Sequence, residues 1–236
     1  MTRSVILQVD NVSKVFGGLL AVAGCSLSVE RGQIFGVIGP NGSGKSTLFN
    51  IISGLLRPST GQVLFEGRPI VGMKPYQLAR RGIGRTFQLP RIFGNLSVAQ
   101  NVEIPRDLCN AASEHPVEHY LEIFNLAALA EIPARSLSHG QQKLLEFAMA
   151  AAAKPKILLL DEPTAGVNPH FITRMEGIIR DFKAQGTTIV MVEHTLRVVD
   201  SLCDRVLVLD QGRVVAEGTP QELKSMPDVR KAYFLL

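Results

Sequence analysis

The 236-residue chain carries 25 lysines and arginines against 21 acidic residues and is 46% hydrophobic. This length is enough to bury a full core, and we expect one α/β domain with an inserted or flanking subdomain. The net charge of +4 is spread along the chain, without a basic stripe interleaved with aromatic side chains, so we expect no nucleic-acid partner.

Neither a membrane span nor an export signal is predicted. The longest apolar runs, such as 157–160 and 189–192, are far shorter than the roughly 20 residues that a transmembrane helix needs. The first apolar run ends too early for a secretory signal, so we expect the protein to remain in the cytoplasm. Cys25, Cys109 and Cys203 are widely separated and form no C-x-x-C pair, as is usual in a reducing compartment.

Alternation of apolar and polar residues at 5–9 and 25–29 predicts two partly exposed antiparallel strands at the start of the fold. The apolar run 34–38 predicts a buried strand. A helix is expected at 45–53, with Gly54 at its C-terminal end. The chain therefore begins with an antiparallel layer and then enters a strand-turn-helix unit.

The turn of that unit, Gly39-Pro-Asn-Gly-Ser-Gly-Lys-Ser46, matches the phosphate-binding pattern G-x-x-x-x-G-K-[ST]. Its glycines allow backbone N–H groups to face the phosphates of a nucleoside triphosphate, and the helix N-terminus adds partial positive charge. Lys45 is expected to reach the β- and γ-phosphates, and the Ser46 hydroxyl to hold Mg²⁺. The predicted nucleotide contacts are Gly39, Pro40, Asn41, Gly42, Ser43, Gly44, Lys45, Ser46 and Thr47.

From residue 88 to residue 153 the pattern becomes mainly helical, with several prolines as punctuation. We expect a helical subdomain at 88–153, inserted into a core made of 1–87 and 154–236, all within a single domain of residues 1–236. The two core segments together would carry both the parallel strands and the antiparallel layer.

Short apolar strands return at 157–160, 187–192 and 205–209, separated by helical stretches. This alternation predicts a mostly parallel buried sheet with ligand at the carboxyl ends of its strands. Gln211-Gly212 predicts a hairpin that brings the strand 213–217 back to the antiparallel layer.

Asp161 and Glu162 directly follow the strand 157–160, at the edge where the phosphates are expected. Asp161 suits Mg²⁺ binding through the water shell of the ion, whereas Glu162 suits the orientation or deprotonation of an attacking water. A solvated acidic turn after a strand is the structural alternative.

Leu137-Ser-His-Gly-Gln141 precedes the helical run 142–153. Ser138 is a good N-cap, so a purely local role in starting the helix is one interpretation. The other is a second anion site, because a capped helix N-terminus attracts phosphate.

These motifs, in this order and with Gln88 and His194 at matching positions, resemble the ATP-binding cassette ATPases over essentially the whole chain. The resemblance implies a P-loop NTPase core that hydrolyses ATP with Mg²⁺ and works as a head-to-tail dimer. Each ATP would lie between the phosphate-binding loop of one subunit and Ser138, Gly140 and Gln141 of the other.

The resemblance also implies the roles of individual side chains. Gln88 would sense Mg²⁺ and the attacking water, and His194 would contact the γ-phosphate. Phe16 matches the aromatic residue that stacks on adenine, with a core position as the alternative. The implied catalytic set is Glu162, His194, Gln88 and Lys45, and the implied Mg²⁺ set, partly through water, is Ser46, Gln88 and Asp161.

Two positions depart from the family pattern. Asn168 stands where the family usually has an aspartate, and its place before Pro169 is also typical of a helix N-cap. His139 replaces the commoner glycine of the signature. Neither change is expected to abolish hydrolysis.

Within the family, several segments look most like the ATPase of branched-chain amino-acid importers, with the related urea or short-chain amide importers sharing much of the pattern. The segments are 48–54, 82–88, 165–169, 192–194, 217–220 and 227–233. The resemblance implies a peripheral subunit on the cytoplasmic face of the inner or plasma membrane. Its implied partners are two transmembrane permeases, a second ATPase subunit (identical or related) and, indirectly, a solute-binding protein. An exporter-type ATPase, as in lipopolysaccharide transport, and a soluble clamp acting on nucleic acid or ribosomes are the alternatives.

Overall fold

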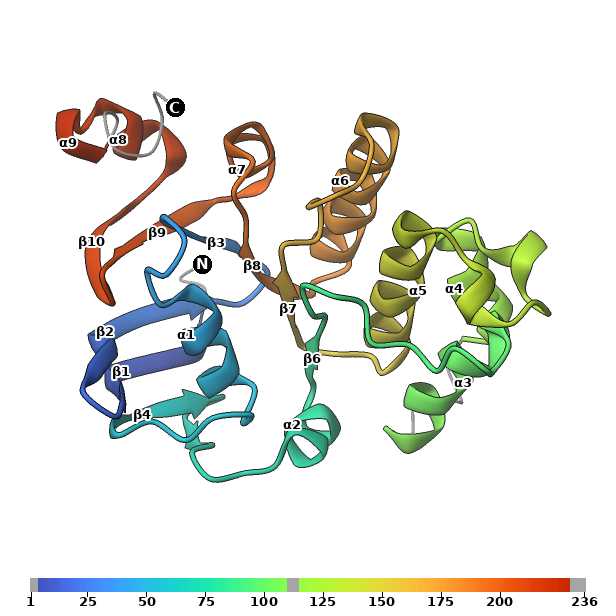
Figure 1. Ribbon diagram of the computed structural model, residues 1–236, viewed down its shortest axis with the longest axis horizontal. Helices are drawn as coiled ribbons and strands as arrows, with labels where there is room; N and C mark the ends of the chain where they lie inside the picture. The colour runs from blue at the N-terminus through green and yellow to red at the C-terminus, as the bar shows by residue number, and fades with distance from the viewer. Residues whose placement is uncertain (1–3, 110–114, 230–236) are drawn as a thin grey trace.

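A computed structural model describes residues 4–109 and 115–229, and its strands form two sheets (Figure 1). The six-stranded sheet has the order β10-β9-β3-β8-β7-β6. Its strands are β3 (Ile34–Ile38), β6 (Ile83–Arg85), β7 (Ile157–Asp161), β8 (Thr188–Val192), β9 (Arg205–Asp210) and β10 (Arg213–Gly218). All neighbours are parallel except β9 and β10, and every residue of β3, β7 and β8 is buried. The predicted α/β fold with a mostly parallel sheet is confirmed.

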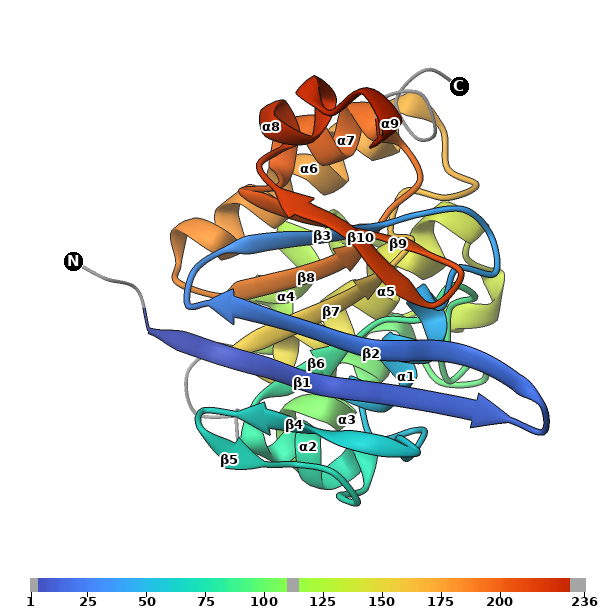
Figure 2. The same cartoon turned by 90° about the vertical axis from the view of Figure 1, so that its left-hand side faces the viewer.

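The second sheet is antiparallel and lies against one face of the first, as Figure 2 shows. Its order is β2-β1-β4-β5, and its strands are β1 (Val5–Phe16), β2 (Leu19–Glu30), β4 (Thr60–Phe65) and β5 (Arg68–Pro69). Because side chains alternate along a strand, Phe35 and Val37 of β3 pack into the core toward this sheet, whereas Ile34 and Ile38 pack into the core on the helical side.

Helices cover the remaining faces. The described helices are α1 (Lys45–Ile52), α2 (Pro75–Arg81), α3 (Val98–Leu108), α4 (Val117–Ile123), α5 (His139–Ala152), α6 (Pro169–Ala184), α7 (Leu196–Leu202), α8 (Pro220–Ser225) and α9 (Pro227–Val229), with 3₁₀ turns at Ala127–Leu129 and Ala134–Ser136. Within the described ranges, none of these helices is both long and apolar enough to cross a bilayer.

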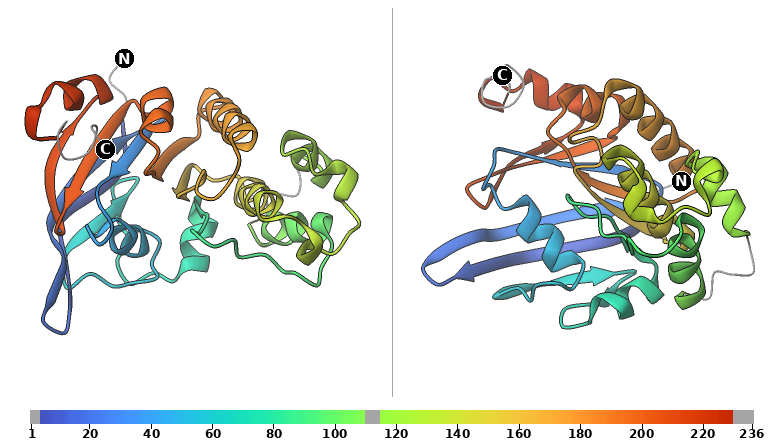
Figure 3. Two further views of the ribbon diagram at one scale, coloured as in Figure 1. Left: turned by 45° about the horizontal axis from the view of Figure 1, so that its top comes forward. Right: turned by 45° about the vertical axis from the view of Figure 1, so that its right-hand side comes forward.

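The helices α3, α4 and α5 form a lobe beside the two sheets, which is clearest in Figure 1 and the left panel of Figure 3. The lobe falls within the predicted subdomain 88–153, whose limits stay a prediction. The short strand β6, just before residue 88, was not predicted, because three residues are too few to establish a period.

The expected return of 213–217 to the antiparallel layer is wrong. The tight turn at Gln211-Gly212 makes β10 pair with β9, so β10 becomes the antiparallel edge of the six-stranded sheet. Its turn still touches β2, where the Ala23 N–H donates to the Gly212 carbonyl at 2.8 Å.

Three phenylalanines join the helical lobe to α6. The ring centroids of Phe124 and Phe147 lie 5.0 Å apart, and the Phe182 ring lies 6.2 and 5.8 Å from them. Phe124 and Phe147 are fully buried, so this cluster fixes α5 against α6 through apolar contact.

Replacing Phe124 by alanine should lower the free energy of unfolding by about 3–5 kcal/mol, because the substitution leaves a cavity in the buried phenylalanine cluster. Urea unfolding followed by circular dichroism measures this. Phe93→Ala is the matched control, since Phe93 is 49% exposed, and its loss should stay below about 1 kcal/mol. Equal losses in the two variants would contradict the role given to the cluster.

Candidate functional site

The phosphate-binding loop joins β3 to α1 in a conformation that only glycine fits at several positions. Gly39, Gly42 and Gly44 have φ values of 148°, 80° and 104°. A Cβ at Gly39 would lie 2.0 Å from the Leu209 carbonyl oxygen, and one at Gly44 would lie 2.5 Å from the Ala21 carbonyl oxygen. The loop is therefore pressed against β2 and β9, and its backbone follows the path that the sequence pattern predicts.

The polar groups of this loop fit a polyphosphate. The Ser43 hydroxyl is buried and has no hydrogen-bond partner within the described structure. Gly44, the N-cap of α1, offers no side chain to the first amides of the helix. An unpaired buried hydroxyl and free amides at a helix N-terminus are the groups that an anionic ligand would satisfy.

Lys45 folds back over the loop, where its Nζ donates to the carbonyl oxygens of Gly39 and Pro40 at 2.9 Å each. Burial lowers the pKa of Lys45, and the charges of Glu162 and Asp161 oppose that shift. The ammonium group thus lies at the loop with acidic residues nearby, in the position from which it can exchange carbonyl ligands for phosphate oxygens.

Glu162 lies at the centre of a hydrogen-bonded group formed by three loops. Its Oε2 accepts from Gln88 Nε2 at 3.0 Å, and its Oε1 lies 2.9 Å from His194 Nε2. Gln88 follows β6, Glu162 follows β7 and His194 follows β8, and these three strands are neighbours in the parallel sheet. The sheet order brings together residues that are far apart in the sequence.

The backbone of Glu162 is held in the left-handed region, with φ of 49°. Its N–H donates to the Val192 carbonyl at 3.0 Å, and its own carbonyl accepts from Lys143 Nζ at 2.8 Å. A non-glycine residue in this region is uncommon and persists when its surroundings determine it, as these two contacts do here.

Asp161 is buried and paired with Arg85, whose Nη2 lies 3.1 Å from Asp161 Oδ2. Burial raises the pKa of Asp161, and the Arg85 charge and hydrogen bond oppose this. Arg85 also donates to the Ser53 hydroxyl at the end of α1. The predicted Mg²⁺ donors lie on different elements: Asp161 ends β7, Ser46 is an exposed residue in the first turn of α1, and Gln88 follows β6.

The segment 138–141 forms the N-terminus of α5 and closes on itself. Gln141 N–H donates to Ser138 Oγ at 3.4 Å, and Ser138 N–H donates to Gln141 Oε1 at 2.9 Å, a reciprocal capping box. The local N-cap role of Ser138 is therefore confirmed. In Figure 1, α5 lies in the helical lobe and α1 on the far side of β6 and β7, so the two candidate anion sites of one chain are apart.

Phe16 lies at the exposed end of β1, near the hairpin to β2, and is 43% exposed. Lys14 Nζ lies 5.1 Å from the centre of its ring. The core position that the sequence left open for Phe16 is therefore wrong, and the ring is available for stacking.

Asn168 is the N-cap of α6, and its side chain accepts from the Phe171 N–H at 3.1 Å. Its capping role is confirmed.

Sequence reasoning missed several buried charges around Glu162. Glu193 accepts from Thr164 N–H and Oγ1 at 3.1 and 2.5 Å and from the N–H groups of His194 and Thr195 at 3.0 and 3.1 Å. It therefore fixes the loop of His194 to the loop of Glu162. Arg85, Lys143 and Glu146 were missed as well. Of these three, only Glu146 lies in an otherwise apolar run, 144–148, which is the signal that could have found it.

Replacing Arg85 by methionine should destabilise the protein by about 3–5 kcal/mol in urea unfolding at pH 7, because Asp161 would stay buried without its cation. Arg31→Met is the control, since Arg31 forms an ion pair with Glu66 on the surface, where a pair contributes less than about 1 kcal/mol. If Arg85→Met lowers the free energy of unfolding by no more than Arg31→Met does, the ion pair with Arg85 is not what stabilises buried Asp161.

Two family models match parts of this chain. The family model described as ABC transporter matches residues 22–165. A second model, described as branched-chain amino acid ATP-binding cassette transporter, matches residues 213–234.

Curated relatives match over nearly their full length. The high-affinity branched-chain amino acid transport ATP-binding protein BraF of Pseudomonas aeruginosa is 37% identical, with 97% of each chain covered. The lipopolysaccharide export system ATP-binding protein LptB of Acidithiobacillus ferridurans is 34% identical, with 98% of this chain and 97% of the relative covered.

Two solved structures are also similar. The ADP conformation of MJ1267, an ATP-binding cassette of an ABC transporter, has a TM-score of 0.86 at 35% identity and covers 99% of this chain and 100% of that one. A dimeric post-hydrolysis state of the ATP-binding cassette MJ0796, bound to ADP and Pi, has a TM-score of 0.83 at 26% identity, covering 91% of this chain and 99% of that one.

Proposed function

The chain belongs to the family of ATP-hydrolysing ABC transporter subunits, and from this premise we propose that it drives an importer of branched-chain amino acids or a related small polar solute. The main support for ATP hydrolysis at this site is the position of the Glu162 carboxylate, which is hydrogen-bonded to Gln88 and His194 and lies near the charge of Lys45. The match at 213–234 and the name of BraF support the importer and its substrate class.

In the proposed reaction, Glu162 orients a water and accepts its proton while the water oxygen attacks the γ-phosphorus of ATP. The bond between the γ-phosphorus and the β,γ-bridging oxygen breaks, and ADP leaves with inorganic phosphate as the second product. Gln88 and His194 hold the two carboxylate oxygens, so the base is fixed before the substrate arrives. Lys45 and the amides at the N-terminus of α1 balance the negative charge of the phosphates. Phe16, exposed at the end of β1, is proposed to stack on the adenine.

Mg²⁺ fits the donor set at this edge of the sheet. We propose that Ser46, Gln88 and Asp161 hold the ion, partly through water, since oxygen donors are the ligands that Mg²⁺ prefers. The ion supplies charge neutralisation at the β- and γ-phosphates. The Arg85 pair favours the ionised form of Asp161 against the effect of burial, which is the form that such a ligand needs.

The second half of each ATP site is proposed to come from another subunit. Ser138, Gly140 and Gln141 stand at the exposed start of a 14-residue helix, away from the phosphate-binding loop of their own chain. A Cβ at Gly140 would lie 3.2 Å from the Phe171 ring, so this helix end is also closely packed against α6. The partner subunit is either a second copy of this chain or a related ATPase.

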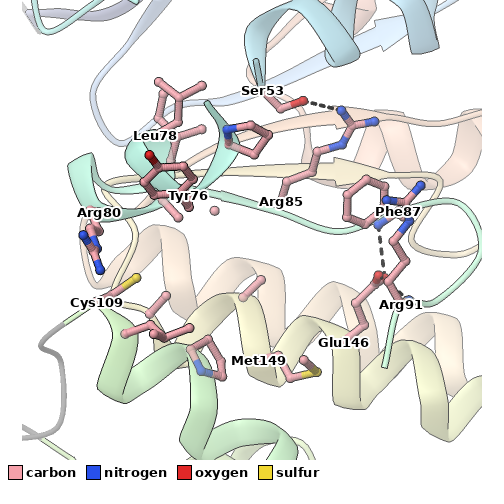
Figure 4. A pocket seen from close by; sticks show the side chains of 18 of the residues that line it. Ser53, Tyr76, Leu78, Arg80, Arg85, Phe87, Arg91, Cys109, Glu146 and Met149 are labelled. Carbon is pink, nitrogen blue, oxygen red and sulfur yellow. Dashed lines mark hydrogen bonds between the residues drawn. The ribbon is translucent and has the colours of Figure 1, made fainter. Parts of the chain in front are cut away.

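A surface for the permease is proposed at the cavity in Figure 4, of about 400 Å³, between α2 and β6 on one side and α3 and α5 on the other. Exposed apolar side chains lie around it, including Leu55, Tyr76 and Leu108. Apolar side chains gathered on an exposed surface mark an interaction site. The chain would then be peripheral at the cytoplasmic face of the membrane, bound to two permeases and served indirectly by a solute-binding protein.

The exporter alternative has weaker support. LptB is similar to this chain, but at lower identity than BraF, and the C-terminal match at 213–234 is to the branched-chain amino acid transporters. The soluble clamp finds no support among the relatives described above, which are all named for transport.

Glu162→Gln should reduce kcat for ATP by about 10²–10⁴-fold while ATP still binds, because the amide cannot accept the proton from water. The uncleaved ATP should then hold a dimer that light scattering detects after gel filtration. Lys45→Ala should instead weaken ATP binding and give no dimer. Glu118→Gln, an exposed position on α4, is the control. A Glu162→Gln variant with the wild-type rate would remove Glu162 from its role.

Transport can be tested in proteoliposomes that hold this chain with the two permeases and the solute-binding protein of a branched-chain amino acid importer. Leucine-loaded binding protein should raise the ATPase rate and drive leucine uptake. Stimulation by urea with no response to leucine would move the substrate to the amide class. Stimulation by lipopolysaccharide would contradict import.

A further inference from the structure

One face of α5 carries two buried charges that reach into the catalytic loops. Lys143 and Glu146 are three residues apart, so they project from the same side of the helix, and each is 5% exposed. Lys143 Nζ donates to the backbone carbonyl of Glu162 at 2.8 Å. The helix α5 thus contacts the loop of Glu162 through Lys143. Glu146, on the same side of the helix, contacts a different loop.

Glu146 binds the loop of Gln88 at two points, as Figure 4 shows. Its Oε2 accepts from the Phe87 N–H at 3.1 Å, and its Oε1 accepts from the Arg91 N–H at 2.8 Å. These amides stand on either side of Gln88, whose side chain donates to Glu162. A single carboxylate therefore closes the loop 87–91 around the glutamine.

The positive charges near the Glu146 carboxylate favour its ionised form, which is the stronger hydrogen-bond acceptor for the loop. Burial raises the pKa of Glu146 to about 7, and the hydrogen bonds from the Arg91 and Phe87 amides, together with the charges of Lys143 and Arg91, oppose the rise. The Arg91 guanidinium also lies 3.9 Å from the centre of the Phe87 ring. When Glu146 is ionised, charge-assisted hydrogen bonds hold the loop in a partly desolvated place, where such bonds are strong.

We propose that Glu146 is a positioning residue that couples α5 to Gln88, so that a displacement of α5 changes how Gln88 holds Glu162. The inference rests on the proposed function, in which the N-terminus of α5 at Ser138 binds the ATP of the other subunit. Glu146 lies eight residues further along, about 12 Å down the helix axis. ATP held in trans at Ser138 is thereby linked to the base in the same chain through one rigid helix and one carboxylate.

Glu146→Gln tests this with little change of shape. Its amide oxygen can accept one of the two N–H groups, but its NH₂ group would face the other donor. We expect kcat to fall about tenfold with KM for ATP unchanged, since one hydrogen bond to the loop is lost. Hydrogen exchange by NMR should show at least one of the Phe87 and Arg91 amides exchanging about tenfold faster. Glu146→Asp, which keeps the charge on a shorter side chain, should lie between the wild type and Glu146→Gln.

Glu176→Gln is the control, because Glu176 is a buried helical carboxylate on α6 that is paired with Arg180 and, within the described residues, makes no hydrogen bond to the loop 87–91. The inference is overturned if Glu146→Gln keeps both the wild-type kcat and the wild-type exchange at Phe87 and Arg91, or if Glu176→Gln produces the same kcat loss. A wild-type protein without ATPase activity would instead overturn the proposed function. The exchange measurement needs no turnover, so it still decides whether Glu146 holds the loop.

Discussion

The hydrogen bonds that Glu162 receives from Gln88 and makes with His194 depend on the order of three parallel strands. Because β6, β7 and β8 are adjacent, the loops that follow them open at the same edge of the sheet. Fully buried, mostly apolar strands such as β7 and β8 keep that order, since their side chains are buried on both faces. The geometry of the Glu162 side chain is thus a consequence of sheet packing rather than of the loops alone.

Buried charges then fix the loops relative to one another. Glu193 joins the loops of His194 and Glu162, Arg85 binds Asp161, and Glu146 holds the loop of Gln88. Each charge has a partner or several donors, which is the condition under which charges remain inside a protein. The carboxylate of Glu162 is positioned before any ligand arrives, and such preorganisation is what electrostatic catalysis requires.

The features of the fold and the site that can be predicted from the sequence are those that depend on the spacing of residues close together in the chain. Glycines at fixed intervals before Lys45 specify the phosphate-binding loop, and the acidic pair Asp161 and Glu162 follows its strand directly. Contacts between residues far apart in the sequence cannot be predicted in this way, since no residue near Glu146 or Arg85 in the sequence indicates which residues they will contact. The hairpin at Gln211 was recognised, but its sheet was not, because a turn specifies which strands pair and leaves open which sheet they join.

The capping box at the start of α5 gives the helix two ways to satisfy its first amides. In the single chain, Ser138 and Gln141 satisfy each other, so the helix is stable without a ligand. In the proposed dimer, a phosphate bound to the other subunit would offer stronger, charge-assisted acceptors to the same helix end. In the proposed dimer, a self-capped helix would gain only the difference between the two kinds of acceptor, which favours binding in trans that reverses when the γ-phosphate leaves. The proposed dimer would then form and separate with each ATP hydrolysed, as a subunit that drives transport requires.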